Sequence, residues 1–473
     1  MTQIEAEGAL RAVDILERTL SEEYPQIELW AASAATVAYR HDAATTPRNA
    51  EPNPDVIGPL VAFPTNAEEV QAIVRAAAAH GVTVVPRGAG SGLAGGASAT
   101  DQQLVITTER LNRILEVSPL DEVAVVEPGV INAALNEHLA RTGLFYAPDP
   151  ASFEISSIGG NIATNAGGLR CAKYGVTRES VLALDVVLAD GSLVSVGHRS
   201  IKGVTGFDLT SLFVGSEGVL GIVVKATLRL RPIPVARQTL TAFFDSTVAG
   251  AEGLGAITLS PVRPSVIEFF DTATLTNIDA HSGTGLRDRG AALILIEIDG
   301  YGIHEQAADL TAALTRAGAR VTVEPDIDAE QLWELRRHGR GFPAGHCFIG
   351  EDIAVPKSNL PRVYAAFAAL EARFGVHISA VAHAGDGNLH PLLTIAADAG
   401  ADQSVAPPEL HEAATELVRI ALALGGTVSG EHGIGTLKRD WAALELTERN
   451  LDIHRALKAA LDPTHTLNPG KAF

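Results

Sequence analysis

Residues 86–97 read PRGAGSGLAGGA and directly follow an apolar run, residues 82–85, that we expect to be a β-strand. The segment contains a GxGxxG match at Gly90, Gly92 and Gly95. A dinucleotide fingerprint of this kind requires a helix that begins at the pyrophosphate. Residues 97–103 are instead short and polar, and residues 104–107 form another apolar run. We therefore reject a Rossmann turn and expect backbone N–H groups, freed by the glycines, to form a nest for phosphate oxygens. A tight glycine turn without a ligand is the alternative.

Two further glycine-rich segments lie in the same half of the chain. They are residues 148–168 (PDPASFEISSIGGNIATNAGG) and residues 215–222 (GSEGVLGI). Three such loops in one domain fit an extended ligand better than three unrelated turns would. A dinucleotide has the required length.

Two polar clusters near the C-terminal end bring three histidines and a glutamate into glycine-rich loops, HAGDGNLH at residues 383–390 and GEHGIG at residues 430–435. Apolar runs on either side of the first loop predict that His383 and His390 lie at the ends of adjacent strands. Each histidine alone is more often an ordinary loop or core residue. Together they suit a zinc-like ion, which prefers imidazole and carboxylate ligands. Because Glu431 and His432 are neighbours, we assign Glu431 to the metal with His383 and His390, and His432 to proton transfer.

Composition and charge exclude several classes of protein. With 46% hydrophobic and 19% charged residues, the 473-residue chain is expected to form two or three globular domains. A formal net charge of −20 argues against nucleic acid or an anionic membrane surface as a partner. Cys171 and Cys347 give no disulfide framework, as in a reducing compartment. The acidic N-terminus lacks a secretory signal, and no apolar stretch approaches the roughly 20 residues that span a bilayer. We therefore expect a cytoplasmic protein without an integral membrane segment.

Local patterns indicate how the chain is organised. Thr65 and Glu68 form a potential capping box for a helix that ends at Gly81, and Asp190-Gly191 predicts a β-hairpin. Pro232 and Pro234 mark a domain boundary. Beyond it, the expected elements are strands at residues 266–270, 291–298 and 320–323 and helices at residues 306–317 and 408–424. This order predicts an α+β domain with helices over an antiparallel sheet.

Several motifs together resemble one family. They are PRGAGSGLAGG, PDPAS, SIGGNIATNAGGLRCAKYGVTRE, DLTSLFVGSEGVLGIV, HAGDGNLHPL, SGEHGIG and the closing LNPGKAF. The chain is similar, from about residue 50 to its end, to the FAD-dependent 2-hydroxyacid dehydrogenases, which are flavoproteins of the vanillyl-alcohol oxidase type. That family includes D-lactate dehydrogenases, glycolate oxidase catalytic subunits and D-2-hydroxyglutarate dehydrogenases.

The resemblance implies an α+β fold with an FAD-binding domain of two subdomains and a cap domain that carries a metal site and an antiparallel sheet. We expect a helical segment at residues 1–53, the FAD domain at 54–232, the cap at 233–440, and returning helices at 441–473. The residues implied to bind the flavin are Pro86, Arg87, Gly88, Ala89, Gly90, Ser91, Gly92, Pro148, Ser152, Ser157, Ile158, Gly159, Gly160, Asn161, Glu217, Gly218 and Ile222. The first loop has no histidine, so we expect noncovalent FAD.

The resemblance also implies the chemistry. His383, His390 and Glu431 would hold zinc or a similar ion, and His432 would accept the proton of the substrate hydroxyl while hydride passes to the flavin. Arg336, with Arg340 close behind, stands where the family binds the substrate carboxylate. Without the resemblance, a solvated helix face would explain both arginines equally well.

Two positions argue against a five-carbon diacid as the substrate. Relatives specific for D-2-hydroxyglutarate have a lysine and an asparagine where this chain has Gly350 and Leu392. We therefore expect oxidation of a small D-2-hydroxyacid, D-lactate or glycolate. The expected electron acceptor is a quinone, a cytochrome or an electron-transfer flavoprotein, and a homodimer is one possible assembly. The alternatives are a metal-dependent hydrolase with purely structural glycine loops, and a flavin subunit that is active only in a larger oxidase complex.

Overall fold

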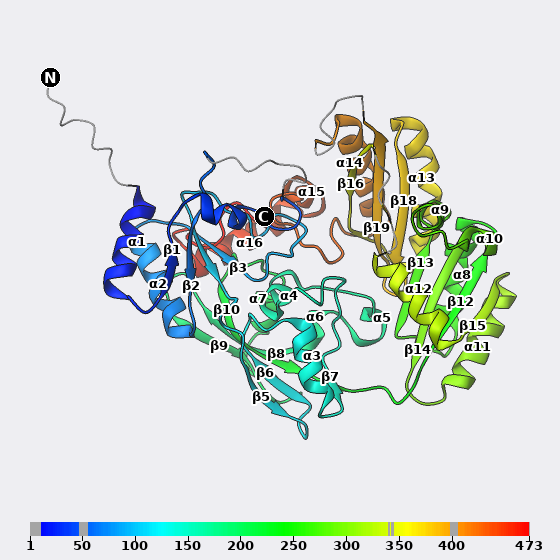
Figure 1. Ribbon diagram of the computed structural model, residues 1–473, viewed down its shortest axis with the longest axis horizontal. Coiled ribbons are helices and arrows are strands. Elements are labelled where there is room, and N and C mark those ends of the chain that lie inside the picture. Colours follow the sequence, from blue (N-terminus) through cyan, green and yellow to red (C-terminus); the bar gives the residue numbers. More distant parts are fainter. Residues whose placement is uncertain (1–10, 47–54, 339–340, 342–344, 398–404, 473) are drawn as a thin grey trace.

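The computed structural model describes residues 11–46, 55–338, 341, 345–397 and 405–472. The chain forms two lobes that lie side by side (Figure 1). The lobe on the left carries the glycine-rich loops, and the lobe on the right is built on one large sheet. Arg340 lies outside the described residues.

The first part of the left lobe is a four-stranded sheet in the order β1-β2-β4-β3. Its elements are α1 (Ala12–Glu23), β1 (Glu28–Trp30), η1 (Ala34–Arg40), β2 (Leu60–Phe63), α2 (Ala67–Ala79), β3 (Val84–Arg87) and β4 (Leu104–Thr107). Strands β2, β3 and β4 are parallel, and β1 is antiparallel to β2. All of residues 88–103 are described, and no helix forms among them, which confirms that this is not a Rossmann turn.

The predicted cap of α2 is wrong by one residue. Asn66, not Thr65, is the N-cap, and its side-chain oxygen accepts a hydrogen bond from the backbone N–H of Glu69 at 2.9 Å. The Glu69 carboxylate in turn accepts from the N–H of Thr65 at 2.7 Å. The side chain that reaches the first free N–H of the helix decides the cap, and Asn66 does so here.

The second part of the left lobe is a five-stranded antiparallel sheet in the order β5-β6-β10-β8-β9. Its strands are β5 (Ile114–Ser118), β6 (Val123–Val126), β8 (Val181–Val187), β9 (Leu193–Gly197) and β10 (Ile222–Arg229). The other elements are α3 (Asn132–Ala140), β7 (Leu144–Phe145), α4 (Ile158–Thr164), α5 (Cys171–Tyr174), α6 (Thr177–Ser180), α7 (Thr210–Phe213) and β11 (Arg231–Pro232). Strands β8 and β9 form the hairpin predicted at Asp190-Gly191.

The right lobe contains an eight-stranded sheet in the order β15-β12-β14-β13-β18-β19-β16, with β17 also paired to β19. Its strands are β12 (Arg237–Phe244), β13 (Val266–Phe270), β14 (Ala292–Asp299), β15 (Arg320–Glu324), β16 (His346–Gly350), β17 (Ile353–Ala354), β18 (His377–His383) and β19 (Asn388–Ala396). Its helices are α8 (Thr247–Leu259), α9 (Thr272–Ser282), α10 (Leu286–Arg289), α11 (Ile303–Arg316), α12 (Asp326–His338), η2 (Lys357–Asn359), α13 (Leu360–Phe374) and α14 (Pro408–Ala423).

Helices cover both faces of this sheet because its central strands are apolar on both sides. Ile294 and Ile296 belong to the core formed with α8, α11, α13 and α14. Leu293 and Leu295 point the opposite way and pack with α9, α10 and α12. The sheet is antiparallel, as predicted for the second domain.

The C-terminal segment returns to the left lobe through α15 (Arg439–Glu445) and α16 (Glu448–Leu461) (Figure 1). Leu467 pairs with Val84 of β3, next to the first glycine loop. The buried Lys458 ammonium donates to the carbonyl oxygens of Val219 and Leu467, both at 2.7 Å. In the part of the chain that the structure describes, no helix is long and apolar enough to cross a membrane.

Candidate functional site

A cavity of about 480 Å³ lies between the glycine-rich loops of the left lobe. We call it the glycine-rich cavity. Of the seventeen residues predicted to bind the flavin, fifteen line it, and the exceptions are Pro148 and Ile158. Ile158 is fully buried in the core beneath the cavity. The carbonyl oxygen of Pro148 accepts a hydrogen bond from Asn132 at 3.0 Å. The three glycine-rich segments thus meet around one cavity.

The loop that begins at the end of β3 is shaped for close approach by a ligand. Gly90 has a φ of +73°, a backbone conformation that favours glycine. A Cβ at Gly88 would meet Ser157 Oγ of the second glycine-rich segment at 2.5 Å. Arg87 supports the loop from within, since its Nη1 donates to the carbonyl oxygen of His41 at 2.7 Å. A branched side chain in this loop would fill the space that an extended ligand needs.

Asp42 also lines this cavity, which the sequence did not predict. Its Oδ1 accepts from the N–H of Thr45 at 3.1 Å. Its Oδ2 is buried and has no hydrogen-bond partner among the described residues. A buried acceptor of this kind fits a hydroxyl-rich ligand such as the ribityl or ribose part of a dinucleotide. The only sequence signal is its place in the HDAATT turn, which is not specific.

In the right lobe, His383, His390 and Glu431 lie together, and we call them the His/His/Glu cluster. His383 ends β18 and His390 lies in β19, and the loop between them closes the predicted antiparallel hairpin. Glu431 Oε1 is 3.4 Å from His383 Nε2 and 3.2 Å from His390 Nε2. Two ligands of one tetrahedral zinc ion are roughly 3.4 Å apart. The spacing of these donors therefore fits a divalent ion.

The charges in the cluster depend on burial and on close partners. Burial lowers the pKa of His390 to about 4, against the effect of the nearby Glu431 carboxylate. Burial alone would raise the pKa of Glu431, but hydrogen bonds from His383 and His390 hold that pKa well below its usual value. Burial alone would lower the pKa of His383, but the Glu268 and Glu431 carboxylates raise it well above its usual value. At neutral pH the cluster thus offers a neutral His390 and the Glu431 carboxylate, and a bound ion would displace a proton from His383.

Arg336 lies next to this cluster, although not as a free cation. Its Nε forms an ion pair with Glu268, a fully buried carboxylate on β13. Glu268 Oε1 also accepts from His383 Nδ1 at 2.6 Å. Sequence reasoning missed Glu268, although one charged residue in the otherwise apolar run VIEFF was a usable signal.

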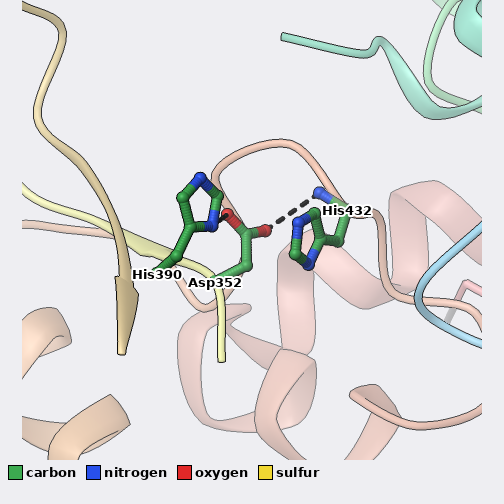
Figure 2. Close-up of side chains that lie close together, drawn as sticks. All are labelled: Asp352, His390 and His432. Atoms are coloured by element: carbon green, nitrogen blue, oxygen red, sulfur yellow. Dashed lines mark hydrogen bonds and ion pairs between the residues drawn. The ribbon is translucent and has the colours of Figure 1, made fainter. Parts of the chain in front are cut away.

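Asp352 is a second acidic residue that was not predicted (Figure 2). Its side chain is fully buried, and Oδ2 accepts from the backbone N–H groups of Glu431 at 3.0 Å and His432 at 2.9 Å. Oδ1 accepts from Asn388 at 2.7 Å. Asp352 also lies within reach of His390 and His432 as a possible metal ligand. Because its oxygens are occupied by these donors, we interpret it as the anchor of the GEHGIG loop.

A carboxylate from the left lobe holds the other end of the same loop. Glu217 accepts from the backbone N–H groups of Ile434 at 2.8 Å and Gly435 at 2.7 Å. The GEHGIG loop is therefore held between Asp352 of one lobe and Glu217 of the other. This places Glu431 and His432 at the wall of the glycine-rich cavity. The His432 ring stacks on His390, with the ring centres 5.2 Å apart.

Both lobes match known protein families. Residues 233–472 match the family described as FAD linked oxidases, C-terminal domain, and residues 59–197 match the FAD binding domain family. The chain belongs to the FAD-linked oxidases. The glycine-rich cavity thus lies in the FAD-binding part of this FAD-linked oxidase, and the His/His/Glu cluster lies in its C-terminal domain.

Relatives of this FAD-linked oxidase act on 2-hydroxyacids, as their names state. The glycolate oxidase subunit GlcD of Bacillus subtilis is 38% identical over 447 residues, which cover 93% of each chain. A D-lactate dehydrogenase of Archaeoglobus fulgidus is 34% identical and covers 92% of this chain and 95% of its own. A D-2-hydroxyglutarate dehydrogenase of Xanthomonas citri is 36% identical over an alignment that covers 89% of this chain and 90% of its own.

Solved structures show the same fold. p-Cresol methylhydroxylase with bound substrate matches with a TM-score of 0.75 at 18% identity, over 98% of this chain and 96% of that chain. Alkyldihydroxyacetonephosphate synthase matches with a TM-score of 0.73 at 19% identity, over 96% and 84%. The predicted fold class, a flavoprotein of the vanillyl-alcohol oxidase type with an antiparallel cap sheet, is confirmed. The chain is therefore an FAD-linked oxidoreductase, and its relatives oxidise hydroxyacids.

Proposed function

We propose that this FAD-linked oxidase converts a small D-2-hydroxyacid, D-lactate or glycolate, to the 2-oxoacid with the help of a divalent metal ion. The proposal is supported by one observation, that the His/His/Glu cluster adjoins the glycine-rich cavity. Glu431 of the His/His/Glu cluster and the adjacent His432 both line the glycine-rich cavity. A substrate on the cluster would therefore lie against a flavin bound in the cavity.

The chemistry divides among the parts of the site. A bound ion would lower the pKa of the substrate hydroxyl, and bound FAD would accept the hydride from the α-carbon. His383, His390 and Glu431 would hold the ion, with zinc as the expected metal. His432 would take the hydroxyl proton at a ring nitrogen, and its stacking on His390 and the anchored backbone N–H keep the ring in place.

Arg336 is proposed to bind the substrate carboxylate. Its Nε is paired with Glu268, which orients the guanidinium, and the Nη groups would donate to the carboxylate. Arg340 remains a second candidate from the sequence.

Two residues of the sheet in the right lobe favour a small substrate over a five-carbon diacid. Gly350 and Leu392 are direct partners in the pairing of β16 with β19. Leu392 is buried, and nothing lies within 4 Å of a Cβ added at Gly350. In this pair no cation or amide is present to bind a second carboxylate. A five-carbon diacid would therefore lose the contacts that the lysine and asparagine supply in its specific relatives.

The hydrolase alternative is set aside because the chain belongs to the FAD-linked oxidases. The possibility of a subunit in a larger complex keeps support from the relative named as a glycolate oxidase subunit. We expect the natural acceptor to be a quinone, a cytochrome or an electron-transfer flavoprotein. A cytoplasmic location remains the expectation from the sequence.

The test is a screen of D- and L-2-hydroxyacids with a redox dye, using the isolated chain. We expect turnover of D-lactate or glycolate, much less of L-lactate, and little of D-2-hydroxyglutarate. Acid precipitation should release yellow FAD, because the first loop offers no histidine for attachment. A clear preference for D-2-hydroxyglutarate would contradict the small substrate. If no 2-hydroxyacid reduces the dye, the isolated chain is not the proposed enzyme.

A further inference from the structure

Glu268 is a fully buried carboxylate that lies outside the His/His/Glu cluster and directly opposite one of its members. In the pairing of β13 with β18, Glu268 is the cross-strand partner of His383. Its Oε1 is 2.6 Å from His383 Nδ1, and its Oε2 is paired with Arg336 Nε. The two oxygens thus contact a candidate metal ligand and a candidate substrate ligand at once.

The geometry decides which nitrogen of His383 carries the proton. Nδ1 is 2.6 Å from the Glu268 carboxylate but 3.5 Å from Arg336 Nη2, which is at the limit of a hydrogen bond. The short contact requires Nδ1–H to donate to Glu268. Nε2 faces Glu431 Oε1, 3.4 Å away, and its proton is the one that a bound ion would displace, which leaves the proton on Nδ1. This is the tautomer and the direction that a metal ligand needs.

We propose that Glu268 is a positioning residue that fixes the tautomer and ring orientation of His383 for metal binding while it holds Arg336 in place. The inference rests on the metal site of the proposed function. It assigns Glu268 no contact with the ion, the flavin or the substrate. A carboxylate behind a metal-binding histidine commonly improves metal affinity 10- to 100-fold.

The replacement Glu268→Gln tests this role through its chemistry. Arg336 is a permanent donor, so it would take the amide oxygen of the glutamine. The amide N–H₂ would then face Nδ1 and favour the tautomer with the proton on Nε2, which cannot bind an ion there. We therefore expect a loss of metal affinity without a loss of flavin.

A matched control exists at the far edge of the same sheet. Glu324 of β15 is also buried and pairs with an arginine, since its Oε1 is 2.8 Å from Arg289 Nη2. Glu324 touches none of the described candidate ligands. Glu324→Gln therefore removes a similar buried charge without facing a metal-binding histidine.

The experiment measures zinc affinity in FAD-loaded protein that a chelator has stripped, by competition with a coloured chelator. Glu268→Gln should bind zinc about 10- to 100-fold more weakly than the parent, with unchanged flavin content. Glu324→Gln should bind like the parent. Because the Arg336 charge loses its balancing carboxylate in the first variant, which could unfold the protein, the double variant Glu268→Met/Arg336→Met is also compared with Arg336→Met. The double variant should show the same loss.

If Glu268→Gln or the double variant binds zinc as tightly as its reference, Glu268 is not a positioning residue, although the metal site stands. If the parent itself binds no zinc, the metal site fails and the inference fails with it.

Discussion

The glycine-rich cavity is lined mainly by backbone and small side chains, whereas the His/His/Glu cluster consists of ionisable side chains, buried at His383 and half-buried at His390 and Glu431, that lie close together. The cavity offers N–H groups and open space, and a ligand is held there by close approach. The cluster offers charge, which its neighbours Glu268 and Asp352 orient. Added atoms or charge should therefore weaken ligand binding in the cavity. Removed or neutralised groups should weaken metal binding by the cluster.

The largest effect should follow a charge placed in the cavity. Gly90→Asp would put a carboxylate into the nest expected to bind the pyrophosphate, so the protein should be purified without yellow colour or turnover. Gly255→Asp makes the same change at an exposed position of α8, where nothing lies within 4 Å of the added Cβ, and should keep both. Flavin content after acid release and dye reduction measure the two variants. A yellow, active Gly90→Asp protein would show that the loop is only a turn.

Removing the proposed base, His432, beside the His/His/Glu cluster should leave the yellow flavin colour unchanged. We expect His432→Ala to lower turnover by about 10²- to 10⁴-fold, the usual effect of losing a general base. Flavin and metal content should match those of the parent, because the predicted metal ligands remain. Steady-state kinetics and elemental analysis are the measurements. Residual activity within about tenfold of the parent would identify another group as the base.

Lys471 is a buried cation of the left lobe that contacts the residue following the first glycine-rich segment. Its Nζ donates to the carbonyl oxygen of Ser98 at 2.8 Å, but burial lowers the pKa of Lys471 to about 8. The unfolded chain keeps this proton up to about pH 10.5, so between about pH 8 and 10.5 it binds more protons than the folded protein. Stability should therefore rise over that range, by about 3 kcal/mol at most.

Thermal unfolding at pH 7.5 and pH 10 isolates this effect when the parent is compared with Lys471→Met. The variant should lack the part of the pH dependence that comes from the ammonium. Equal pH dependence in both proteins would mean that the ammonium is not destabilised by burial.

The smallest effect should come from the link between the two regions. Glu217→Gln can accept from only one of the N–H groups of Ile434 and Gly435 through its amide oxygen, and an unpaired buried N–H costs about 1–3 kcal/mol. We expect turnover to fall about tenfold with flavin retained. Glu69→Gln is the control, since that carboxylate also accepts a backbone N–H but lies away from the cavity. The same turnover in both variants would show that Glu217 does not hold the GEHGIG loop in place.

Much of the fold could be predicted because its patterns are local. Strands β4 and β13 match the predicted ranges, and α14 ends one residue before the predicted end. Strand β12 was not predicted, because six successive buried residues leave no alternation along most of its length. The domain boundaries at residues 53/54, 232/233 and 440/441 stay predictions.

The candidate site was predicted only where residues of one cluster are close in sequence. His383 and His390 share a hairpin, and Glu431 and His432 share a loop. Glu268 is 115 positions from His383, and their contact depends on the register of β13 beside β18. Asp352 reaches the GEHGIG loop in the same way, from a distant strand end. Such partners follow from sheet order, which local patterns do not specify. The roles of all these residues stay predictions.

The most direct test of two cooperating sites is anaerobic mixing of the purified yellow protein with D-lactate or glycolate, before and after chelation. We expect the flavin colour to bleach rapidly in the metal-loaded protein and to stay unchanged in the stripped protein. Added zinc, manganese or cobalt should restore bleaching to different degrees. His390→Ala should behave like the stripped protein, because two remaining ligands hold an ion poorly. Rapid bleaching in a sample shown by elemental analysis to be metal-free would contradict the metal role and leave the histidines as hydrogen-bond donors to the substrate.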